Sequence, residues 1–267
     1  MSGFSAEWLA LREPADAAAR APAVHRFVLD ALATVRPMRI VDLGSGAGSN
    51  VRYLSSRIRQ PQEWHLVDHD ARLLAHARAL LPMPCATHVA DLGRLDPGLL
   101  AGCTLVTASA LLDLVSEGWL ASFVQLCRQA HAAVLVALNY DGRIHCSPAD
   151  EDDEFVRDRV NRHQRTDKGF GPALGPDAGA FAEARLRGAG YDVVRERSDW
   201  ILDAARAELQ RQLIAGWADA AIELEPPAVA RITAWKTRRL AHVDAGRSGI
   251  VVGHDDVGAV NPRGEVR

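Results

Sequence analysis

The chain has 267 residues, of which 48% are hydrophobic and 24% are charged, and its formal net charge is −3. This composition is typical of a globular protein with a sizeable core. A net charge near zero argues against a strongly basic surface for nucleic acid or anionic lipid.

The spacing of the cysteines and the composition of the N-terminus indicate the cellular compartment. The four cysteines are scattered without a C-x-x-C pair, so their spacing predicts no metal site and is typical of reduced thiols (Cys85, Cys103, Cys127 and Cys146). Acidic residues appear early at the N-terminus, and no apolar run reaches the roughly eighteen residues of a membrane span. We therefore expect a cytoplasmic protein without membrane segments.

Short apolar runs alternate with amphipathic stretches over the first half of the chain. Residues 5–35 predict helix in two pieces, around Pro14 and Pro22. The following strands show little polar alternation, as in a parallel sheet covered on both faces, and their repetition with helices predicts a doubly wound sheet. The expected strands are 39–43, 64–68, 85–91, 104–109 and 132–140, and the expected helices are 49–60, 71–81 (capped by Asp70) and 117–130.

The second half is less regular. A helix ended by glycines is expected at 181–191, an alternating strand at 192–202, two helices within 204–243 and a last strand at 248–254. No internal repeat or composition shift indicates a second domain.

Residues 41–50, VDLGSGAGSN, place three glycines between a strand and a helix. Gly44, Gly46 and Gly48 form G-x-G-x-G, whereas the dinucleotide fingerprint is G-x-G-x-x-G. Glycines at such a turn let backbone N–H groups approach a ligand closely. Asp42, two residues earlier, suits a ligand with an ammonium and a sulfonium better than a pyrophosphate.

Three more polar residues end neighbouring strands. Asp68 ends the second strand, Asp91 the third and Ser109 the fourth. The carboxyl ends of parallel strands share one edge of the sheet, which is where open α/β sheets bind ligands. A carboxylate at Asp68 can accept both hydroxyls of a ribose, and Asp91 can meet an adenine amino group. This ordered set favours S-adenosylmethionine (SAM) over a nicotinamide dinucleotide as cofactor.

These motifs resemble those of the class I SAM-dependent methyltransferases of small-molecule type, over residues of about 38–140. VDLGSGAGSN matches the glycine loop of that family, LVDHD its ribose site, VADL its adenine site, and TASALLDLVS the segment after strand four. The resemblance implies that the glycine loop with Ser45 lines the methionine part of SAM. It also implies that Asp42 lies near the amino group and Arg20 near the carboxylate, and that His69 and Leu92 flank the adenine.

The resemblance implies an α/β fold with a doubly wound, mostly parallel, seven-stranded Rossmann-like sheet, an antiparallel last strand and helical lid insertions. We expect a single domain over 1–267. Its parts would be an N-terminal helical lid (1–36), a SAM-binding core (37–140), a lid or substrate insertion (141–176), a C-terminal half (177–257) with a helical insertion (204–243), and a tail (258–267).

The long segment after the fifth strand is the expected substrate side. Its length is typical of a functional lid. The acidic run 150–154 is read as favourable helix-dipole charge rather than a metal site, and no metal is expected. The basic run that follows is either a solvated face or a grip for an anionic group, with Arg162 and Arg165 as candidates. Asn139 and Tyr140 are expected to face the acceptor, and the base candidates are Asp113 and His163.

We expect transfer of a methyl group to a small, anionic metabolite by in-line displacement, with no nucleic-acid partner. Alternatives are an rRNA or protein methyltransferase and a catalytically inactive SAM-binding partner protein. A base-nitrogen methyltransferase usually carries an Asp/Asn-Pro-Pro-aromatic element where this chain reads SALLD. A nicotinamide oxidoreductase is disfavoured because neither Tyr-x-x-x-Lys nor a His-Asp set is found. Apolar positions on the 204–243 helices would allow a homodimer.

Overall fold

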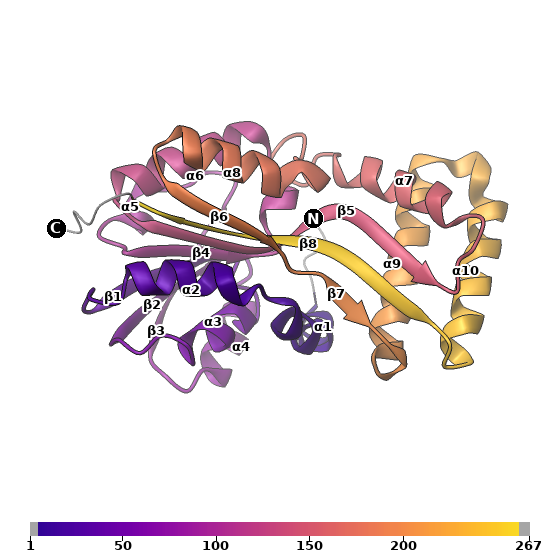
Figure 1. Cartoon of the computed structure of the whole chain (residues 1–267), viewed down its shortest axis with the longest axis horizontal. Coiled ribbons are helices and arrows are strands. Elements are labelled where there is room, and N and C mark those ends of the chain that lie inside the picture. The colour runs from indigo at the N-terminus through magenta and orange to yellow at the C-terminus, as the bar shows by residue number, and fades with distance from the viewer. Residues whose placement is uncertain (1–4, 262–267) are drawn as a thin grey trace.

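A single twisted sheet runs through the computed structural model, which describes residues 5–261. Its strand order is β3-β2-β1-β4-β5-β8-β6, with β7 also paired to β8 (Figure 1). Strands β1 to β5 are mutually parallel, and β8 is antiparallel to β5, β6 and β7. This confirms the expected doubly wound, mostly parallel sheet with an antiparallel last strand. The strands are β1 (Met38–Leu43), β2 (Gln62–Asp68), β3 (Cys85–Val89), β4 (Leu105–Ser109), β5 (Ala133–Ser147), β6 (Asp192–Arg197), β7 (Trp200–Leu202) and β8 (Gly249–Val260).

The sheet has eight strands where seven were expected, because the predicted strand 192–202 is interrupted. The chain turns at Ser198, whose amide donates to the carbonyl of His254, and β6 and β7 then follow one another along β8. Two strands are also longer than expected. β5 continues past residue 140, and β8 includes residues 258–260 of the predicted tail. The remainder of that tail, 262–267, lies outside the described residues.

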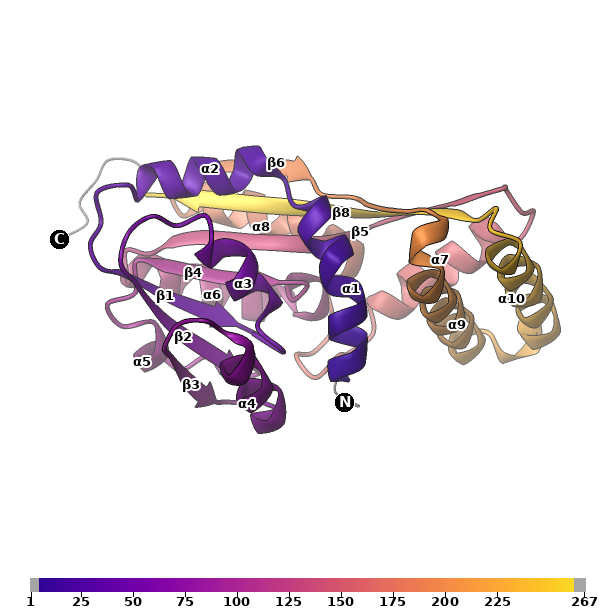
Figure 2. The ribbon, with the colours of Figure 1, turned by 90° about the horizontal axis from the view of Figure 1, so that it is seen from below.

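Helices cover both faces of the sheet, as buried parallel strands require. α2, α3 and α4 pack on one face, and α6 and α8 on the other (Figures 1 and 2). The expected break at Pro14 is wrong: α1 runs through this exposed proline, and the chain bends only at Arg20–Ala21. The helices are α1 (Ala6–Ala19), α2 (Pro22–Ala31), α3 (Ser49–Ser55), α4 (Ala71–Leu80), α5 (Pro97–Leu100), α6 (Glu117–Gln129), α7 (Asp153–Gln164), α8 (Ala178–Gly188), α9 (Ala207–Leu224) and α10 (Val229–Asp244). Within residues 5–261, no helix is both long and apolar enough to cross a membrane.

The far ends of β5 and β8 extend beyond the other strands and carry α7, α9 and α10 (Figure 1). This extension, made of residues 141–164 and 200–252, has its own hydrophobic cluster, which includes Trp200, Trp217 and Trp235. The cluster is separate from the two that flank the parallel strands. Composition along the chain does not reveal this cluster, because its apolar residues lie in four separate segments, one of which is α1 with Ala15.

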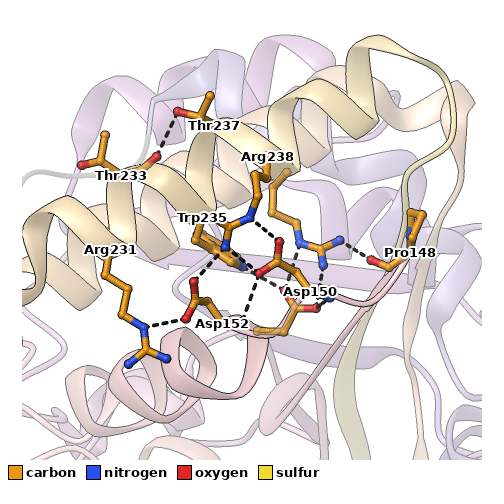
Figure 3. A network of polar contacts seen from close by, with 10 residues as sticks. Pro148, Asp150, Asp152, Arg231, Thr233, Trp235, Thr237 and Arg238 are labelled. Carbon is orange, nitrogen blue, oxygen red and sulfur yellow. Dashed lines mark hydrogen bonds and ion pairs between the residues drawn. The ribbon is translucent and has the colours of Figure 1, made fainter.

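An ion-pair network joins the start of α7 to α10 (Figure 3). Asp150 accepts two hydrogen bonds from Arg238, of 2.6 and 2.8 Å, and Asp152 accepts from both Arg231 and Arg238. The hydrogen bonds from Arg238 lower the pKa of Asp150 to about 2. The acidic run predicted to favour a helix start is thus also paired with arginines about eighty residues away.

Arg239 is the buried member of this network, with no exposed surface. It donates to both carboxylate oxygens of Asp153, at 2.9 and 2.6 Å, and to the carbonyl of Pro148 at 2.6 Å. A buried guanidinium is stable only when its donors are satisfied, so this residue fixes where the chain leaves β5.

We expect Asp153→Ala to lower the free energy of unfolding by about 3–5 kcal/mol, because it leaves the buried Arg239 without its carboxylate. Urea unfolding measures the loss. The exposed Arg247→Ala serves as control and is expected to change stability by less than about 0.5 kcal/mol. Equal stability of the two variants would contradict the role of the pair.

Candidate functional site

The glycine turn after β1 lies against the end of β2. The Ser45 hydroxyl donates to the carbonyl of Asp42 at 2.7 Å and accepts the amide of Val67 at 3.1 Å. The amide of Gly46, a residue with φ of +50°, donates to the Asp68 carboxylate at 2.8 Å. The structure therefore brings together the predicted glycine loop, Asp42 and Asp68 at the carboxyl edge. The Ser45 hydroxyl is occupied in joining the two strands.

A buried polar chain links three elements beside this turn. Arg20 donates to Asn50 Oδ1 at 2.7 Å, and Asn50 Nδ2 donates to Asp42 Oδ1 at 2.7 Å and to Thr107 Oγ1 at 3.1 Å. Arg20 and Asp42 are 5% and 1% exposed. The sequence reading missed Asn50, although a polar side chain in the first turn after a glycine loop is a usable signal.

Both ends of this chain have unused hydrogen-bonding capacity. Asp42 Oδ2 accepts no hydrogen bond, and Nε and one terminal nitrogen of Arg20 donate none. The Arg20 guanidinium also lies 3.4 Å from the Asp256 carboxylate. Buried polar atoms without partners are rare in proteins, so such a group indicates a place for a ligand. The atoms without a hydrogen bond are thus Asp42 Oδ2, an acceptor, and two guanidinium nitrogens of Arg20, of which Nε is the one that faces Asp256. Asn50 links the two residues.

Burial controls the charge of Asp42. Loss of hydration raises the pKa of its carboxyl from an ordinary value of 3.8 to about 7, although the hydrogen bond from Asn50 and the nearby Arg20 act in the opposite direction. A cation bound at Oδ2 would favour the ionised form. The Asp42 carboxylate therefore lacks a positively charged partner that would stabilise its ionised form.

A cavity of about 240 Å³ adjoins this chain, between α1, α3 and the end of β4. Arg20, Asn50 and the predicted Ser109 all contribute to its wall, so Ser109 and Arg20 lie around one space. The Tyr53 ring lies between two guanidinium groups, 4.5 Å from that of Arg20 and 3.7 Å from that of Arg57. The other lining residues are Glu13, Asp16, Ala17, Ser49 and Arg52.

The predicted ribose and adenine residues continue the edge on the other side of the glycine turn. Asp68 accepts the amide of Asp70 at 3.0 Å, and the ring of His69, largely exposed, lies 3.2 Å from it. Asp91 accepts the amide of Gly93 at 2.8 Å and is exposed. Leu92 is buried, and a β-carbon placed on Gly44 would lie 3.9 Å from its methyl group. The order along the edge is thus the one the sequence predicted.

Helix α1 lies over the glycine turn. A β-carbon on Gly46 would lie 3.2 Å from a methyl of Leu9, and Glu13 forms a two-bond ion pair with Arg52 of α3 at 2.6 and 2.7 Å. Figure 2 shows α1 standing between the parallel strands and α9. That the N-terminal residues 1–36 act as a lid stays a prediction.

A second group of polar and aromatic side chains lies beyond α1. Asp113, in a 3₁₀ turn after β4, is buried, and one of its carboxylate oxygens has no partner. Burial raises its pKa to about 6. Tyr140, whose pKa is raised chiefly by burial and to a lesser extent by Asp113, donates to Asn161 of α7 at 2.7 Å.

His254 lies opposite Tyr140 in the β5–β8 pairing and was missed by the sequence reading. Its ring lies 6.3 Å from that of Tyr140 and 5.1 Å from that of Trp200. Nδ1 donates to the carbonyl of Val252 at 3.1 Å, which makes Nε2 the acceptor of the neutral ring. Burial and, secondarily, the charge of Arg12 lower its pKa to about 3. A histidine at the end of a predicted strand was the available signal.

Four other predicted residues have different surroundings. Asn139 is buried at a register shift of β5, where its amide donates to the carbonyl of Asp255 at 2.9 Å. His163 lies 3.2 Å from Glu223 of α9, and Arg165 pairs with Asp177 at 2.8 Å. Arg162 is exposed on α7. The contacts of Asn139, His163 and Arg165 are with structural neighbours rather than with the glycine turn.

In the part of the chain that the structure describes, no three His, Cys, Asp or Glu side chains are grouped to hold a metal ion.

Comparison with known proteins finds no matching protein-family model and no matching curated protein. Solved structures with similar folds include a cyclopropane synthase and two SAM-dependent methyltransferases. The cyclopropane synthase MmaA2 from Mycobacterium tuberculosis has a TM-score of 0.49 and 12% identity, over 96% of this chain and 94% of that one. A SAM-dependent methyltransferase from Geobacter sulfurreducens, in complex with S-adenosylhomocysteine, has a TM-score of 0.47 and 15% identity, over 98% and 100%. A SAM-dependent methyltransferase from Thiobacillus denitrificans has a TM-score of 0.46 and 14% identity, over 97% and 99%. At these identities the likeness concerns the fold.

The raised pKa of Asp42 makes stability depend on pH. The unfolded carboxyl ionises near pH 3.8 but the folded one only near 7, so unfolding releases a proton between these values and stability falls as pH rises through them. We expect Asp42→Asn to raise the free energy of unfolding by about 4 kcal/mol at about pH 8, with the gain vanishing near pH 4. Urea unfolding at both pH values, with the exposed Asp30→Asn as control, measures this. A gain independent of pH would contradict the assignment.

Proposed function

We propose that this protein is a SAM-dependent methyltransferase with a small-molecule acceptor. The observation that carries the proposal is the chain Asp42–Asn50–Arg20, with free acceptor and donor atoms at its two ends. A ligand with an ammonium and a carboxylate attached to one carbon complements both ends at once. The amino-acid part of SAM is such a group, whereas the pyrophosphate of a nicotinamide dinucleotide would meet the Asp42 carboxylate unfavourably.

The other residues at the carboxyl edge of the sheet are suited to bind the nucleoside part of SAM. Asp68 would accept the ribose hydroxyls in place of the Gly46 and Asp70 amides that it now accepts. Asp91, Leu92 and His69 would surround the base, with Ser109 on the cavity wall near the methionine part. All of these lie at the ends of parallel strands, where sheets of this kind bind ligands.

Methyl transfer needs alignment and exclusion of water more than acid–base groups, because the sulfonium supplies an activated methyl group with a good leaving group. In this chain α1 would exclude water from the glycine turn. Asp113, Tyr140 and His254 would face the acceptor, and the Asp113 carboxylate, whose pKa burial raises to about 6, would take up a proton that the acceptor loses. Arg12 is partly buried, with its guanidinium 5.2 Å from the centre of the Trp200 ring, and it adds a positive charge to the acceptor side.

The acceptor class is less constrained than the cofactor. The basic run on α7, expected to hold an anion, is largely paired with acids: Arg159 with Glu225, and Arg165 with Asp177. The proposed acceptor is an anionic small molecule, and the cation on that side is Arg12, which acts electrostatically on Asp113 and His254 and is also paired with Asp16 at 2.9 Å.

Calorimetric titration with S-adenosylhomocysteine, SAM and NADH tests the proposal. We expect both adenosyl ligands to bind and NADH not to bind. We also expect Asp68→Ala to weaken adenosyl binding roughly 100-fold through the loss of two charge-assisted hydrogen bonds.

The matched control is Asp96→Ala, since Asp96 likewise accepts a backbone amide at a turn but lies at the start of α5. Binding of NADH alone would refute the proposal. Unchanged adenosyl affinity in a folded Asp68→Ala would refute the ribose assignment.

The role of Arg20 is separable from that of Asp68. We expect Arg20→Met to weaken S-adenosylhomocysteine binding at least about tenfold, because a carboxylate loses its charged partner. Binding of methylthioadenosine, which has the same nucleoside but no amino acid, should stay within about twofold. Equal losses for both ligands would show that Arg20 acts only through the fold, and thermal unfolding of the variant reports that effect directly.

A further inference from the structure

The insertion after β5 contains a loop, residues 167–172, with a fixed shape. The Asp167 carboxylate accepts the amides of Gly169 and Gly171, at 2.7 and 3.0 Å, and Asp167 also forms an isolated β-bridge with Pro172. Both glycines have positive φ, +98° and +86°, which a side chain would disfavour. This glycine-rich stretch is thus a tight, internally bonded loop.

This loop lies against the turn that follows β3. A β-carbon on Gly93 would lie 3.6 Å from the carbonyl oxygen of Gly169, and the Gly93 amide donates to Asp91. Downstream of the loop, the amide of Leu174 donates to the carbonyl of Val115 at 2.8 Å. The insertion therefore returns from the extension to the carboxyl edge, beside the residues assigned to the base.

Phe170, at the tip of the loop, belongs to a series of contacts that begins at the glycine turn. Its ring lies 5.9 Å from that of Trp119, edge to face, and Trp119 Nε1 donates to the carbonyl of Leu92 at 2.6 Å. Leu92 in turn lies beside Gly44. Phe170 is only half-buried, and Asp91 and Gly93 are exposed. An aromatic ring and a carboxylate are thus available together, and these suit the face and the amino group of an adenine.

We propose that the loop 167–172 forms the outer wall of the nucleoside site, with Phe170 packed against the base. This inference rests on the proposed function. The inference goes beyond the proposed function because the insertion on the acceptor side becomes part of the cofactor site. Since the same insertion carries Asn161, the partner of Tyr140, bound nucleoside would hold the acceptor side in place.

The test compares Phe170→Ala with Phe181→Ala, a matched control on α8 whose side chain is also partly exposed. Calorimetry with S-adenosylhomocysteine and with methylthioadenosine gives the affinities. Stacking of a base on an aromatic ring predicts that Phe170→Ala weakens both ligands by the same factor, roughly tenfold, and that Phe181→Ala changes neither.

A second pair of variants separates stacking from loop folding. Phe170→Trp keeps an aromatic face and should retain affinity for both ligands. Asp167→Ala removes the acceptor of two loop amides and should weaken both, as Phe170→Ala does. Hydrogen exchange in residues 166–175 should slow when methylthioadenosine binds to the wild-type protein.

Unchanged affinities in Phe170→Ala would overturn the inference while leaving the proposed function intact. A loss for S-adenosylhomocysteine alone would overturn it too, because the effect would then lie at the amino-acid end. If the wild-type protein binds neither ligand, the proposed function fails and this inference fails with it.

Discussion

The pairing of β8 with β5 is the constraint on which the other features depend. β8 lies antiparallel between β5 and β6, and the same pair continues outward to carry the extension. Within it, Asp256 is almost fully buried and accepts the amides of Ala21 and Leu138, at 3.0 and 2.8 Å, while facing Arg20. One carboxylate thereby joins the α1–α2 connection to a shifted part of β5. Asp256 thus holds Arg20, through its Nε at 3.4 Å, as a residue of the cavity wall.

The buried carboxylate of Asp42 is only partly stabilised by its neighbours. Asp42 has one hydrogen-bonded oxygen and one free oxygen in a dry environment, and the folded state holds a proton there up to about pH 7. A cationic ligand group would remove that cost, whereas Asp153 and Arg239 already satisfy one another. The two acids show the difference between a structural ion pair and a binding site whose charge has no partner within the protein.

The parallel half of the fold and the order of residues along its edge could be predicted from sequence, because each strand is a short run with a polar residue at or close to its carboxyl end. Asp68, Asp91 and Ser109 followed from that rule alone. The extension could not be predicted in this way. Residues 141–147 of β5 contain Asp, Gly, Arg and His, and they form a strand because β8 pairs with them rather than through local propensity. Register shifts in β5 likewise turned Asn139 toward the backbone of β8.

The separate hydrophobic cluster of the extension affects which substitutions the chain can tolerate during evolution. Substitutions among α7, α9 and α10 repack a core that shares no buried residue with the two cores around the parallel strands. Their effects on stability should add to those of substitutions in these two cores, but couple with changes in α1, because Ala15 of α1 belongs to the same cluster. The packing of α7, α9 and α10 can therefore change with little effect on the cores beneath the nucleoside site, as long as α1 and the loop 167–172 keep their contacts.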